Sequence, residues 1–474
     1  MRRPERVLAW LALAAALAGC SLAPTYQRPR QALPQAYEAV SAADQAAAAP
    51  PAGDWWTIFH DPQLDALQAQ LAAANPDLAA AVAHYDAARA AAGQVSAARL
   101  PQADLQGSAL RNRQSDHRPL RSSSLYEYYD ADTVQLSLGW DLDLWGRLRN
   151  AAAAAHAQAE ASGDDLAAAR LSLQQQLTRT YLELRGLDTR ARILEASLDD
   201  YRQALEMTRR LFDGGLVSEL DVARARHQLA SAGTELDQTR AARDLARHAI
   251  AALVGQPASG FVLEPDPQPL AQPAVPAALP SELLQRRPDI AAAERRVYAA
   301  NAGIGVARAA WFPRLSLTGA GGYQNAGQGQ LLEYGNRFFA LGPSLDLHLF
   351  DGGKRTAARA AAQAEFDAAA AQYRATVLAA IGQVEDQLSV LAQSEQEVRD
   401  QQEAVDAAQR TQQIAQDRYQ AGGASYLEVV SAQTDARQAQ LALQALLTRR
   451  LQASAALMAA LGGGWQAPEH DPHG

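Results

Sequence analysis

Two stretches of the chain alternate apolar and polar residues with a period of two, the spacing of side chains along one face of a β-strand. In the first stretch the apolar positions are Val134, Leu136, Leu138, Trp140, Leu142 and Leu144. In the second they are Phe339, Leu341, Pro343, Leu345, Leu347 and Leu349. Weaker strands are predicted at residues 103–111 and at Leu315, Leu317 and Tyr323. So long an alternation is typical of transmembrane barrel strands, although a soluble half-buried strand shows the same pattern.

After the first strong strand the period becomes helical. From Arg147 to Phe212, apolar and small residues recur at steps of four and three, which predicts a 66-residue helix, roughly 100 Å long, with a coiled-coil seam. The predicted inward positions are Leu173, Leu177, Thr180, Leu184, Leu187, Ala191, Leu194, Leu198, Tyr201, Leu205, Thr208 and Phe212. A return helix continues the seam at Leu229, Ala232, Leu236, Thr239, Arg243, Ala246, Ile250 and Leu253. The second half has one strong row, at Val384, Leu391, Val398 and Val405.

The chain also contains an internal repeat. Pro76-Asp77-Leu78 matches Pro288-Asp289-Ile290 at an offset of 212 residues, and Gly146-Arg147 matches Gly353-Lys354 at an offset of 207. Because sequence repeats fold into repeated structural units, we expect each half to run helix, strand, strand, long helix, helix. Asn75 with Pro76 begins the first of these helices, and Pro101 ends it at about Leu100. The predicted segments are repeats at 63–255 and 281–462, a Pro-rich connector at 256–280 and a polar tail at 463–474.

Each half should contain a sharp helical hairpin. The pairs Gly214-Gly215 and Gly422-Gly423 follow long helical patterns, and glycine readily takes the positive φ that ends a helix. Ser218-x-x-Asp221 and Ser425-x-x-Glu428 follow them as capping boxes that begin the next helices. We expect both hairpin tips at the end farthest from the strands.

Four strands cannot close a barrel around a channel, and an open sheet in lipid would leave its edges unsatisfied. Several protomers must therefore contribute strands, and three would give twelve. No window after the first residues approaches the roughly 18 consecutive apolar residues of a spanning helix, so we expect any membrane crossing to be made by strands.

The N-terminus has the pattern of a secretory lipoprotein. Arg2, Arg3 and Arg6 precede an apolar run from Val7 to Ala18, which predicts a signal peptide at residues 1–19. Leu17-Ala18-Gly19-Cys20 has the form of a lipobox, so Cys20 is the predicted lipidation site at the start of an extended segment, 20–62. An ordinary signal peptide with a chance cysteine is the alternative. Cys20 is the only cysteine, which excludes an intramolecular disulfide.

Composition and motifs exclude other classes of protein. The formal net charge of −9 becomes −11 once the signal, with three Arg and one Glu, is removed, which makes nucleic acid a poor partner. The sequence has no nucleophile elbow, paired-His metal helix or phosphate loop, so we expect no enzyme, no metal site and no cofactor apart from the lipid on Cys20. His470-Asp471-Pro472-His473 is expected to be a polar tail.

Several motifs in this order resemble the TolC-like outer-membrane factor family, in particular its lipoprotein branch serving resistance-nodulation-division pumps. The motifs run along nearly the whole mature chain. They are Pro24-x-Tyr26-x-Arg28-Pro29, Trp55-Trp56-x-x-Phe59-x-Asp61-Pro62-x-Leu64, Leu142-Asp143-Leu144-Trp145-Gly146-Arg147, Leu283-Leu284-Gln285-Arg286-Arg287-Pro288-Asp289-Ile290, Ala292-Ala293-Glu294-Arg295, Ala309-Ala310-Trp311-Phe312-Pro313, Leu349-Phe350-Asp351-Gly352-Gly353 and Ser425-Tyr426-Leu427-Glu428-Val429.

The resemblance implies an α+β membrane protein, a homotrimer whose twelve-stranded β-barrel in the outer membrane continues into a periplasmic α-helical coiled-coil barrel. Its implied function is the exit duct of a tripartite efflux pump, with a periplasmic adaptor and an inner-membrane transporter of the resistance-nodulation-division type as partners. The implied periplasmic gate points to Asp417, Arg418 and Tyr419, with Asp213 as a possible partner. Solvated charges at a helix end are the alternative for these residues. The adaptor-docking residues predicted at the tips are Gly214, Gly215, Leu216, Ser218, Leu220, Gly422, Gly423, Ser425 and Leu427.

Two other functions stay open at this point. One is a duct for type I protein secretion, which belongs to the same family. The other is a soluble, lipid-anchored periplasmic adaptor or adhesin, which would need neither alternating strands nor extracellular loops. Residues 112–131 and 325–336, rich in Arg, Ser, Gly, Asn and Tyr, lie where such loops are expected.

Overall fold

The computed structural model describes residues 21–34, 37, 53–115, 127–266, 268–273, 286–326 and 330–466. The predicted signal peptide, Cys20 and the His470–His473 motif lie outside these residues, as do 116–126 and 327–329 of the predicted loops. The chain divides into two compact units. The first comprises residues up to Arg30, His84–Gly163 and Ala292–Arg374, and the second comprises Gln31–Ala83, Asp164–Ala291 and the residues from Ala375 onward.

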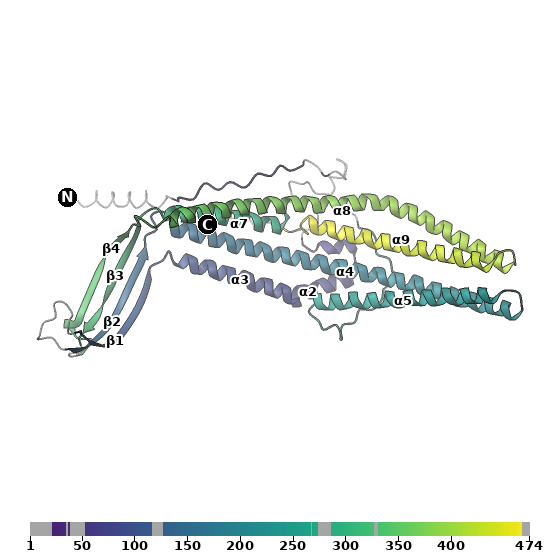
Figure 1. Cartoon of the computed structure of the whole chain (residues 1–474), viewed down its shortest axis with the longest axis horizontal. Coiled ribbons are helices and arrows are strands. Elements are labelled where there is room, and N and C mark those ends of the chain that lie inside the picture. Colours follow the sequence, from purple (N-terminus) through teal and green to yellow (C-terminus); the bar gives the residue numbers. More distant parts are fainter. Residues whose placement is uncertain are drawn as a thin grey trace. The chain divides into compact units, whose positions relative to one another are not determined.

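The predicted order of elements occurs twice along the chain (Figure 1). The first half contains α3 (Pro76–Ala97), β1 (Gln102–Arg113), β2 (Tyr128–Asp141), α4 (Arg147–Asp213) and α5 (Glu219–Leu253). The second contains α7 (Pro288–Ala309), β3 (Arg314–Asn325), β4 (Arg337–Asp346), α8 (Lys354–Gln420) and α9 (Tyr426–Ala460). Corresponding helices have equal lengths of 22, 67 and 35 residues. The predicted helices and strands are therefore confirmed, including the weak strand at 103–111.

The structure corrects some boundaries. The predicted alternation up to Leu144 is wrong as a strand, because β2 ends at Asp141 and a turn follows. Likewise β4 ends at Asp346, before Leu347 and Leu349. Helix α3 ends at Ala97, three residues before the predicted Leu100. The segment 20–62 was predicted to be extended, but η2 (Trp55–Phe59) is a 3-10 helix, and the sequence analysis missed α2 (Pro62–Ala74) as a separate helix.

Capping side chains explain where the two consecutive helices begin. The Asp61 Oδ1 atom accepts hydrogen bonds from the backbone amides of Gln63 and Leu64, at the start of α2. Asn75 then caps α3, because its Oδ1 atom accepts from the amide of Leu78 at 2.8 Å. Its Nδ2 atom also donates to the carbonyl of Leu253, which fixes the start of α3 against the end of α5. The predicted Asn75 cap is thus confirmed.

The first unit contains a four-stranded antiparallel sheet in the order β1-β2-β3-β4 (Figure 1). Residues opposite one another share a face, so the register places Leu105, Leu136, Gly321 and Phe339 in one row across the sheet. The next row on the same face contains Ala103, Leu138, Gly319 and Leu341. The side chains of Leu105, Phe339 and Leu341 are 75%, 88% and 74% exposed. One face of the sheet therefore presents exposed apolar side chains.

The opposite face of the sheet carries mainly polar and small side chains, with Leu110 and Phe338 as large apolar exceptions. Its rows include Gln106 with Gln135, whose side chains share a hydrogen bond of 2.9 Å, and Asp104 with Ser137. Ser316 and Ser344 continue this face on β3 and β4. Strands β1 and β4 are the two edges of the sheet. A sheet with one apolar face, one polar face and two edges is suited to a barrel wall shared among protomers.

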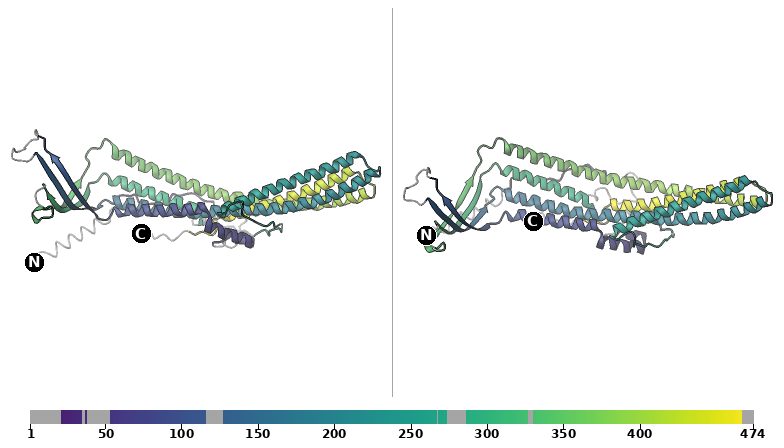
Figure 2. Two further views of the ribbon diagram at one scale, coloured as in Figure 1. Left: turned by 90° about the horizontal axis from the view of Figure 1, so that it is seen from below. Right: turned by 60° about the horizontal axis from the view of Figure 1, so that its bottom comes forward.

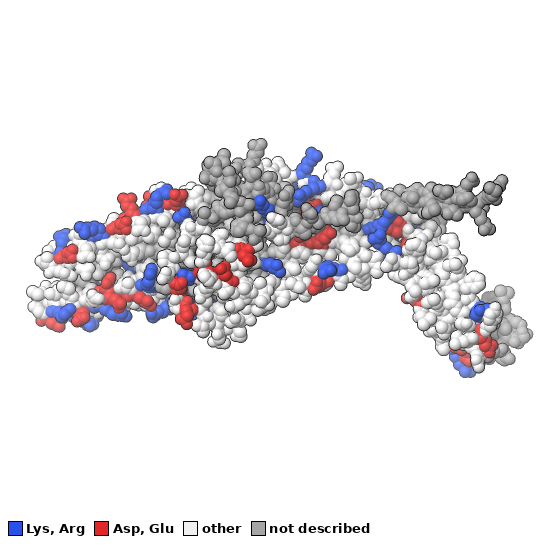
Figure 3. All heavy atoms as spheres, turned by 180° about the vertical axis from the view of Figure 1, so that it is seen from behind, with Lys and Arg blue, Asp and Glu red and all other residues white. Residues whose placement is uncertain are grey.

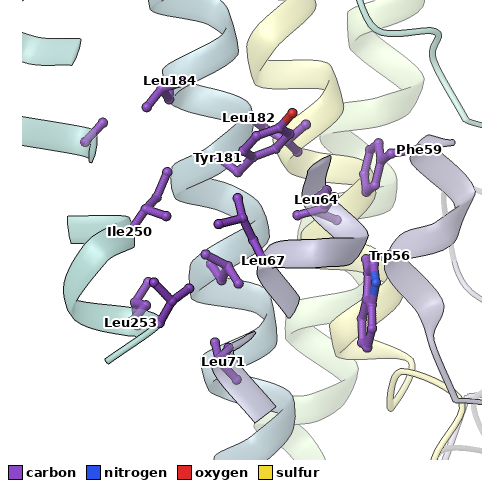
Figure 4. Packing of buried hydrophobic residues seen from close by; sticks show 14 of the residues in the cluster. Trp56, Phe59, Leu64, Leu67, Leu71, Tyr181, Leu182, Leu184, Ile250 and Leu253 are labelled. Atoms are coloured by element: carbon purple, nitrogen blue, oxygen red, sulfur yellow. The ribbon is translucent and has the colours of Figure 1, made fainter. Parts of the chain in front are cut away.

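The main hydrophobic core lies in the second unit, where α2 and η2 pack against α4 (Figure 4). Trp55, Leu64 and Leu71 are fully buried there, as are Tyr181 and Ile250. The aromatic and aliphatic residues of the Trp55–Leu64 motif are thus core residues. Burying a large apolar side chain contributes roughly 1.5–3 kcal/mol, so this motif fixes the segment before α2 onto the helices.

The coiled-coil seam is confirmed with one exception. All predicted seam residues of α4 and α5 are buried or partly buried, except Phe212, which is 41% exposed and was wrongly placed inward. The four seam residues of α8 are also buried or partly buried. Helices α4 and α9 approach closely at Gly186, where a Cβ atom would lie 2.5 Å from the Oγ1 atom of Thr448.

Among the described residues, no helix combines the length and apolar character needed to cross a membrane. In the face shown in Figure 3, acidic and basic side chains are interspersed along the helices, whereas the middle of the sheet carries few charges.

Candidate functional site

Both hairpin turns are helix ends built on glycine. Gly215 and Gly422 have φ values of +70° and +72°, a conformation that residues with a Cβ rarely adopt. After α4, the amide of Leu216 donates to the carbonyl of Leu211 and that of Gly215 to Phe212. After α8, the amides of Gly423 and Gly422 make the same two bonds to Arg418 and Tyr419. The two turns are equivalent Schellman motifs, as the Gly-Gly pairs predicted.

The predicted capping residues then begin α5 and α9. The carboxylate of Asp221 accepts hydrogen bonds from both the amide and the hydroxyl of Ser218. In the second hairpin, the hydroxyl of Ser425 accepts from the amide of Glu428, whose carboxylate accepts from the amide of Ser425. These bonds satisfy backbone groups that a helix start leaves free, so each hairpin reverses the chain within a few residues.

The α4/α5 and α8/α9 hairpins lie side by side near their tips (Figure 2). Tyr426, only 4% exposed, packs into a cluster with Leu205 of α4 and with Val222 and Ala225 of α5. Its ring lies 5.6 Å from the ring of Tyr419, centroid to centroid. Burial raises the pKa of the Tyr426 hydroxyl to about 12. Tyr426 is therefore the side chain that joins the two hairpins at this level.

A second link between the hairpins is ionic. Glu235 of α5 accepts hydrogen bonds from Arg190 of α4 at 2.7 Å and from Arg437 of α9 at 2.6 Å. Nearer the tips, the side chain of Gln228 of α5 donates a hydrogen bond to the hydroxyl of Thr434 of α9 at 2.8 Å. Neither Glu235 nor Arg437 stands out in the sequence. Charged residues on long helices usually face solvent, and no local signal reveals that these two meet from 202 residues apart.

The predicted gate residues occupy the end of α8 and of α4, but the structure does not bring all of them together. Arg418 donates to the carbonyl of Gly423 at 2.9 Å and lies 3.7 Å from the carboxylate of Glu428, within its own hairpin. The Asp417 carboxylate accepts from Gln413, one turn earlier. Tyr419 contacts Tyr426, and Asp213 is the exposed last residue of α4. Within one protomer, Arg418 and Asp417 make their contacts inside their own hairpin. The role of the four residues as a gate stays a prediction.

The predicted docking residues divide into two kinds. Ser218, Ser425 and the glycines form the turns and caps described above. Leu216, Leu220 and Leu427 instead project from the tips, with 75%, 57% and 51% of their surface exposed. Exposed leucines at a hairpin tip are typical of an interaction surface, because each one gains free energy when a partner covers it. Whether they dock an adaptor stays a prediction.

The residues after the predicted lipidation site form a strap in the first unit, residues 21–30. The hydroxyl of Ser21 donates to Asn150 at 2.9 Å, and the amide of Asn301 donates to the carbonyl of Pro24 at 2.9 Å. Gly305 of α7 lies against Ala23 so closely that a Cβ atom there would meet the Ala23 Cβ at 2.8 Å. The strap is thus packed against the helices of its unit.

Tyr26 fixes the same strap to α7. Its hydroxyl donates to the Glu294 carboxylate at 2.5 Å, and its ring lies 5.2 Å from that of Tyr298. Burial and the Glu294 hydrogen bond raise the pKa of Tyr26. The Pro24–Pro29 and Glu294-Arg295 motifs therefore meet in space, which their sequence positions did not indicate.

A buried polar network explains two further motifs. In the second unit, Arg185 pairs with Asp61 at 2.6 Å, and both side chains are 7% exposed. The Tyr181 hydroxyl donates to the same Asp61 oxygen at 2.6 Å. Arg287 similarly pairs with Asp289 at 2.7 Å and donates to the carbonyl of Ala460 at 2.9 Å, at the end of α9. These charged motif residues hold separate elements of the second unit together.

Comparison with known proteins gives one consistent result. The model of the family described as "Outer membrane efflux protein" matches residues 67–256 and 279–463. The chain is 32% identical to the outer membrane protein OprJ of Pseudomonas aeruginosa, over 98% of this chain and 97% of that protein. It is 32% identical to the pyoverdine export outer membrane protein OpmQ of the same species, over 87% of each chain. The solved structure of the outer-membrane channel OprN superposes with a TM-score of 0.84 at 31% identity, covering 94% of this chain and 100% of that one.

Proposed function

Because the chain belongs to the outer membrane efflux protein family, we propose that it is the outer-membrane exit duct of a tripartite efflux pump. It carries small molecules from the periplasm and the inner-membrane transporter to the cell exterior. The observation that carries this function is the sheet with one exposed apolar face and one polar face, in a chain that matches the family over most of its length. Membership of this family of channels also favours the duct over a soluble adaptor.

The pore requires three protomers. The apolar face of the sheet contacts lipid, the polar face lines the water-filled lumen, and edges β1 and β4 pair with neighbouring protomers in a twelve-stranded barrel. The duct supplies a path, and the free energy for export comes from the partner pump. What is carried depends on that pump. The relative OpmQ is named for pyoverdine export, a name that says nothing of the solute in this pump.

We further propose that Cys20 carries the lipid anchor and that the strap holds it in place. The contacts of Ser21, Ala23 and Tyr26 support this, because they fix the residues that directly follow the lipobox. Metabolic labelling with a radioactive fatty acid tests the anchor. We expect label on the parent protein and none on Cys20→Ala, and equal labelling of the two proteins would refute the proposal.

The partners at the hairpin tips are a periplasmic adaptor and a transporter of the resistance-nodulation-division type. The exposed leucines 216, 220 and 427 support adaptor docking at the tips. Photo-crosslinking from positions 218 and 425 is the direct test, with an exposed position away from the tips, Leu245, as the control. An adaptor adduct from the tips and none from position 245 is expected. The absence of an adduct from both tips would refute docking there.

The gate at the tips is proposed to include Asp417, Arg418 and Tyr419, with Asp213 as a partner on a neighbouring protomer. Support comes from their position at the ends of α8 and α4, next to the contact between the hairpins. Single-channel recording of Asp417→Ala and Tyr419→Ala should show a higher conductance than the parent. Asp406→Ala, an exposed acid three turns earlier in α8, is the control. Conductance unchanged in both gate variants would argue against these residues.

A further inference from the structure

A polar cavity of about 250 Å³ lies between α4 and the α8/α9 hairpin, within the second unit. Helix α4 contributes Asp200, Glu206 and Arg210 to its lining, α8 contributes Tyr419, and α9 contributes Tyr426 and Gln433. Three helices from both hairpins thus share one cavity. A ligand bound there would contact all three helices at once.

The cavity contains a buried acceptor without a partner. Gln433 is 4% exposed, and its side-chain oxygen Oε1 makes no hydrogen bond within the described part of the chain. Buried polar atoms are almost always hydrogen-bonded, because leaving one unpaired forfeits its hydration without compensation. The Tyr419 hydroxyl, which belongs to the same lining, is also buried without a hydrogen-bond partner among the described residues. A donor that enters the cavity would satisfy the Gln433 oxygen.

Two carboxylates, Asp200 and Glu206, and one basic side chain, Arg210, line the cavity, so the formal charge of its lining is −1, from 1 − 2. Asp200 has no ion-pair partner among the described residues, whereas the adjacent Asp199 pairs with Arg202 at 2.6 Å. Glu206 lies at the rim, 3.9 Å from Arg210. The rings of Tyr419 and Tyr426 form a neighbouring wall, and aromatic faces attract positive charge. An acceptor oxygen, an uncompensated carboxylate and two aromatic rings together match the chemistry of a protonated amine.

We propose that this cavity binds a small organic cation of the alkyl diamine class. One ammonium group donates to the Gln433 oxygen beside the tyrosine rings, and the other lies at the acidic rim near Asp200. By bridging α4 to α8 and α9, the bound cation holds the two hairpins together. The effect on the gate rests on the proposed function, whereas the binding itself does not.

Isothermal titration calorimetry on the full-length trimer tests binding, with 1,4-diaminobutane as the probe and the neutral 1,4-butanediol as its matched control. The diamine should bind at least tenfold more tightly than the diol. Gln433→Met keeps the volume but removes the acceptor, and should weaken diamine binding about tenfold, as expected for one hydrogen bond to a charged group. Asp200→Asn, an exposed change that leaves the fold intact, should also weaken it. Asp199→Asn removes the same charge one residue away and should bind like the parent.

Four results would overturn the site. The first three are equal binding of diamine and diol, parental binding by both Gln433→Met and Asp200→Asn, and a loss in Asp199→Asn as large as that in Asp200→Asn. The third of these would mean that the general negative field attracts the amine. A basic side chain of a second protomer filling the cavity would also overturn it, and would appear as no diamine binding together with a less stable Gln433→Met trimer.

Single-channel recording then tests the bridging. Diamine added on the hairpin side should lower the open probability of the parent and leave Gln433→Met unaffected. Binding without any change in channel current would refute the bridging role while the site stands. If diamine binds but Asp417→Ala and Tyr419→Ala conduct like the parent, the proposed gate fails and the binding site does not.

Discussion

The buried pair of Asp61 and Arg185 gives a prediction whose size follows from its contacts. Asp61 has two tasks, because one carboxylate oxygen caps α2 through the amides of Gln63 and Leu64 and the other accepts from Tyr181 and Arg185. Arg185 has other partners too, since it pairs with Asp266 at 2.8 Å and donates to two backbone carbonyls. Both charges lie in the core between α2 and α4.

Asp61→Ala should destabilise α2 by about 4 kcal/mol. The lost cap costs about 1 kcal/mol. Breaking a buried ion pair from one side costs about 3–5 kcal/mol, and the lower end applies because Arg185 keeps Asp266. Arg185→Met should cost less, about 2 kcal/mol, the size of one hydrogen bond to a charged group, because Asp61 retains three donors. The double variant has no buried unpaired charge, so its cost should fall at least about 2 kcal/mol below the sum.

Hydrogen exchange of the α2 amides, measured by mass spectrometry on the assembled protein, reports this local opening. A change of 4 kcal/mol corresponds to exchange about a thousandfold faster in Asp61→Ala. Asp65→Ala serves as the control, because Asp65 is an exposed first-turn acid of the same helix and its loss should change exchange less than about threefold. Exchange less than tenfold faster in Asp61→Ala, or strict additivity in the double variant, would refute the reasoning.

Three further predictions concern the turns, the strap and the tip. Gly255→Ala and Gly462→Ala should each destabilise the trimer by more than about 2 kcal/mol, because both glycines have positive φ and a Cβ would lie about 2 Å from the carbonyl oxygens of Ala74 and Arg286. Thermal melts measure this, with Gly233→Ala as the control, because Gly233 is a helical position with open space. Equal melting temperatures of all three variants would contradict the prediction. Gly305→Leu should displace the strap and speed proteolytic cleavage within residues 21–30. Gly303→Leu should not, because a Cβ atom at Gly303 would have no atom within 4 Å. Burial raises the pKa of Tyr426 to about 12 in the folded protein, above the value near 10 of an unfolded tyrosine. The contribution of Tyr426 to stability is therefore complete below pH 10 and is lost as the pH rises to 12. Hydrogen exchange of the hairpin amides, measured as the pH is raised, should show this loss in the parent and not in Tyr426→Phe.

Much of the fold follows from local pattern. The period of two at Leu136 and Leu138, the steps of four and three along α4, and the Gly-Gly turns with their Ser caps are properties of adjacent residues. Each depends on the steric and hydrogen-bonding preferences of residues within one short segment. The internal repeat then extends the interpretation of one half to the other.

The structure decided what depends on contacts between distant residues. The end of β2 at Asp141 could not be predicted, because Leu142 and Leu144 continue the alternation while the chain turns. The join between the hairpins depends on Tyr426 meeting Leu205, and on Glu235 meeting Arg437. Gln433 lines a cavity that three helices share, and its oxygen is buried there without a hydrogen-bond partner among the described residues. Sequence periodicity specifies on which face of its helix or strand a residue lies. The packing of one helix against another specifies which residue it contacts and how far it is exposed to water.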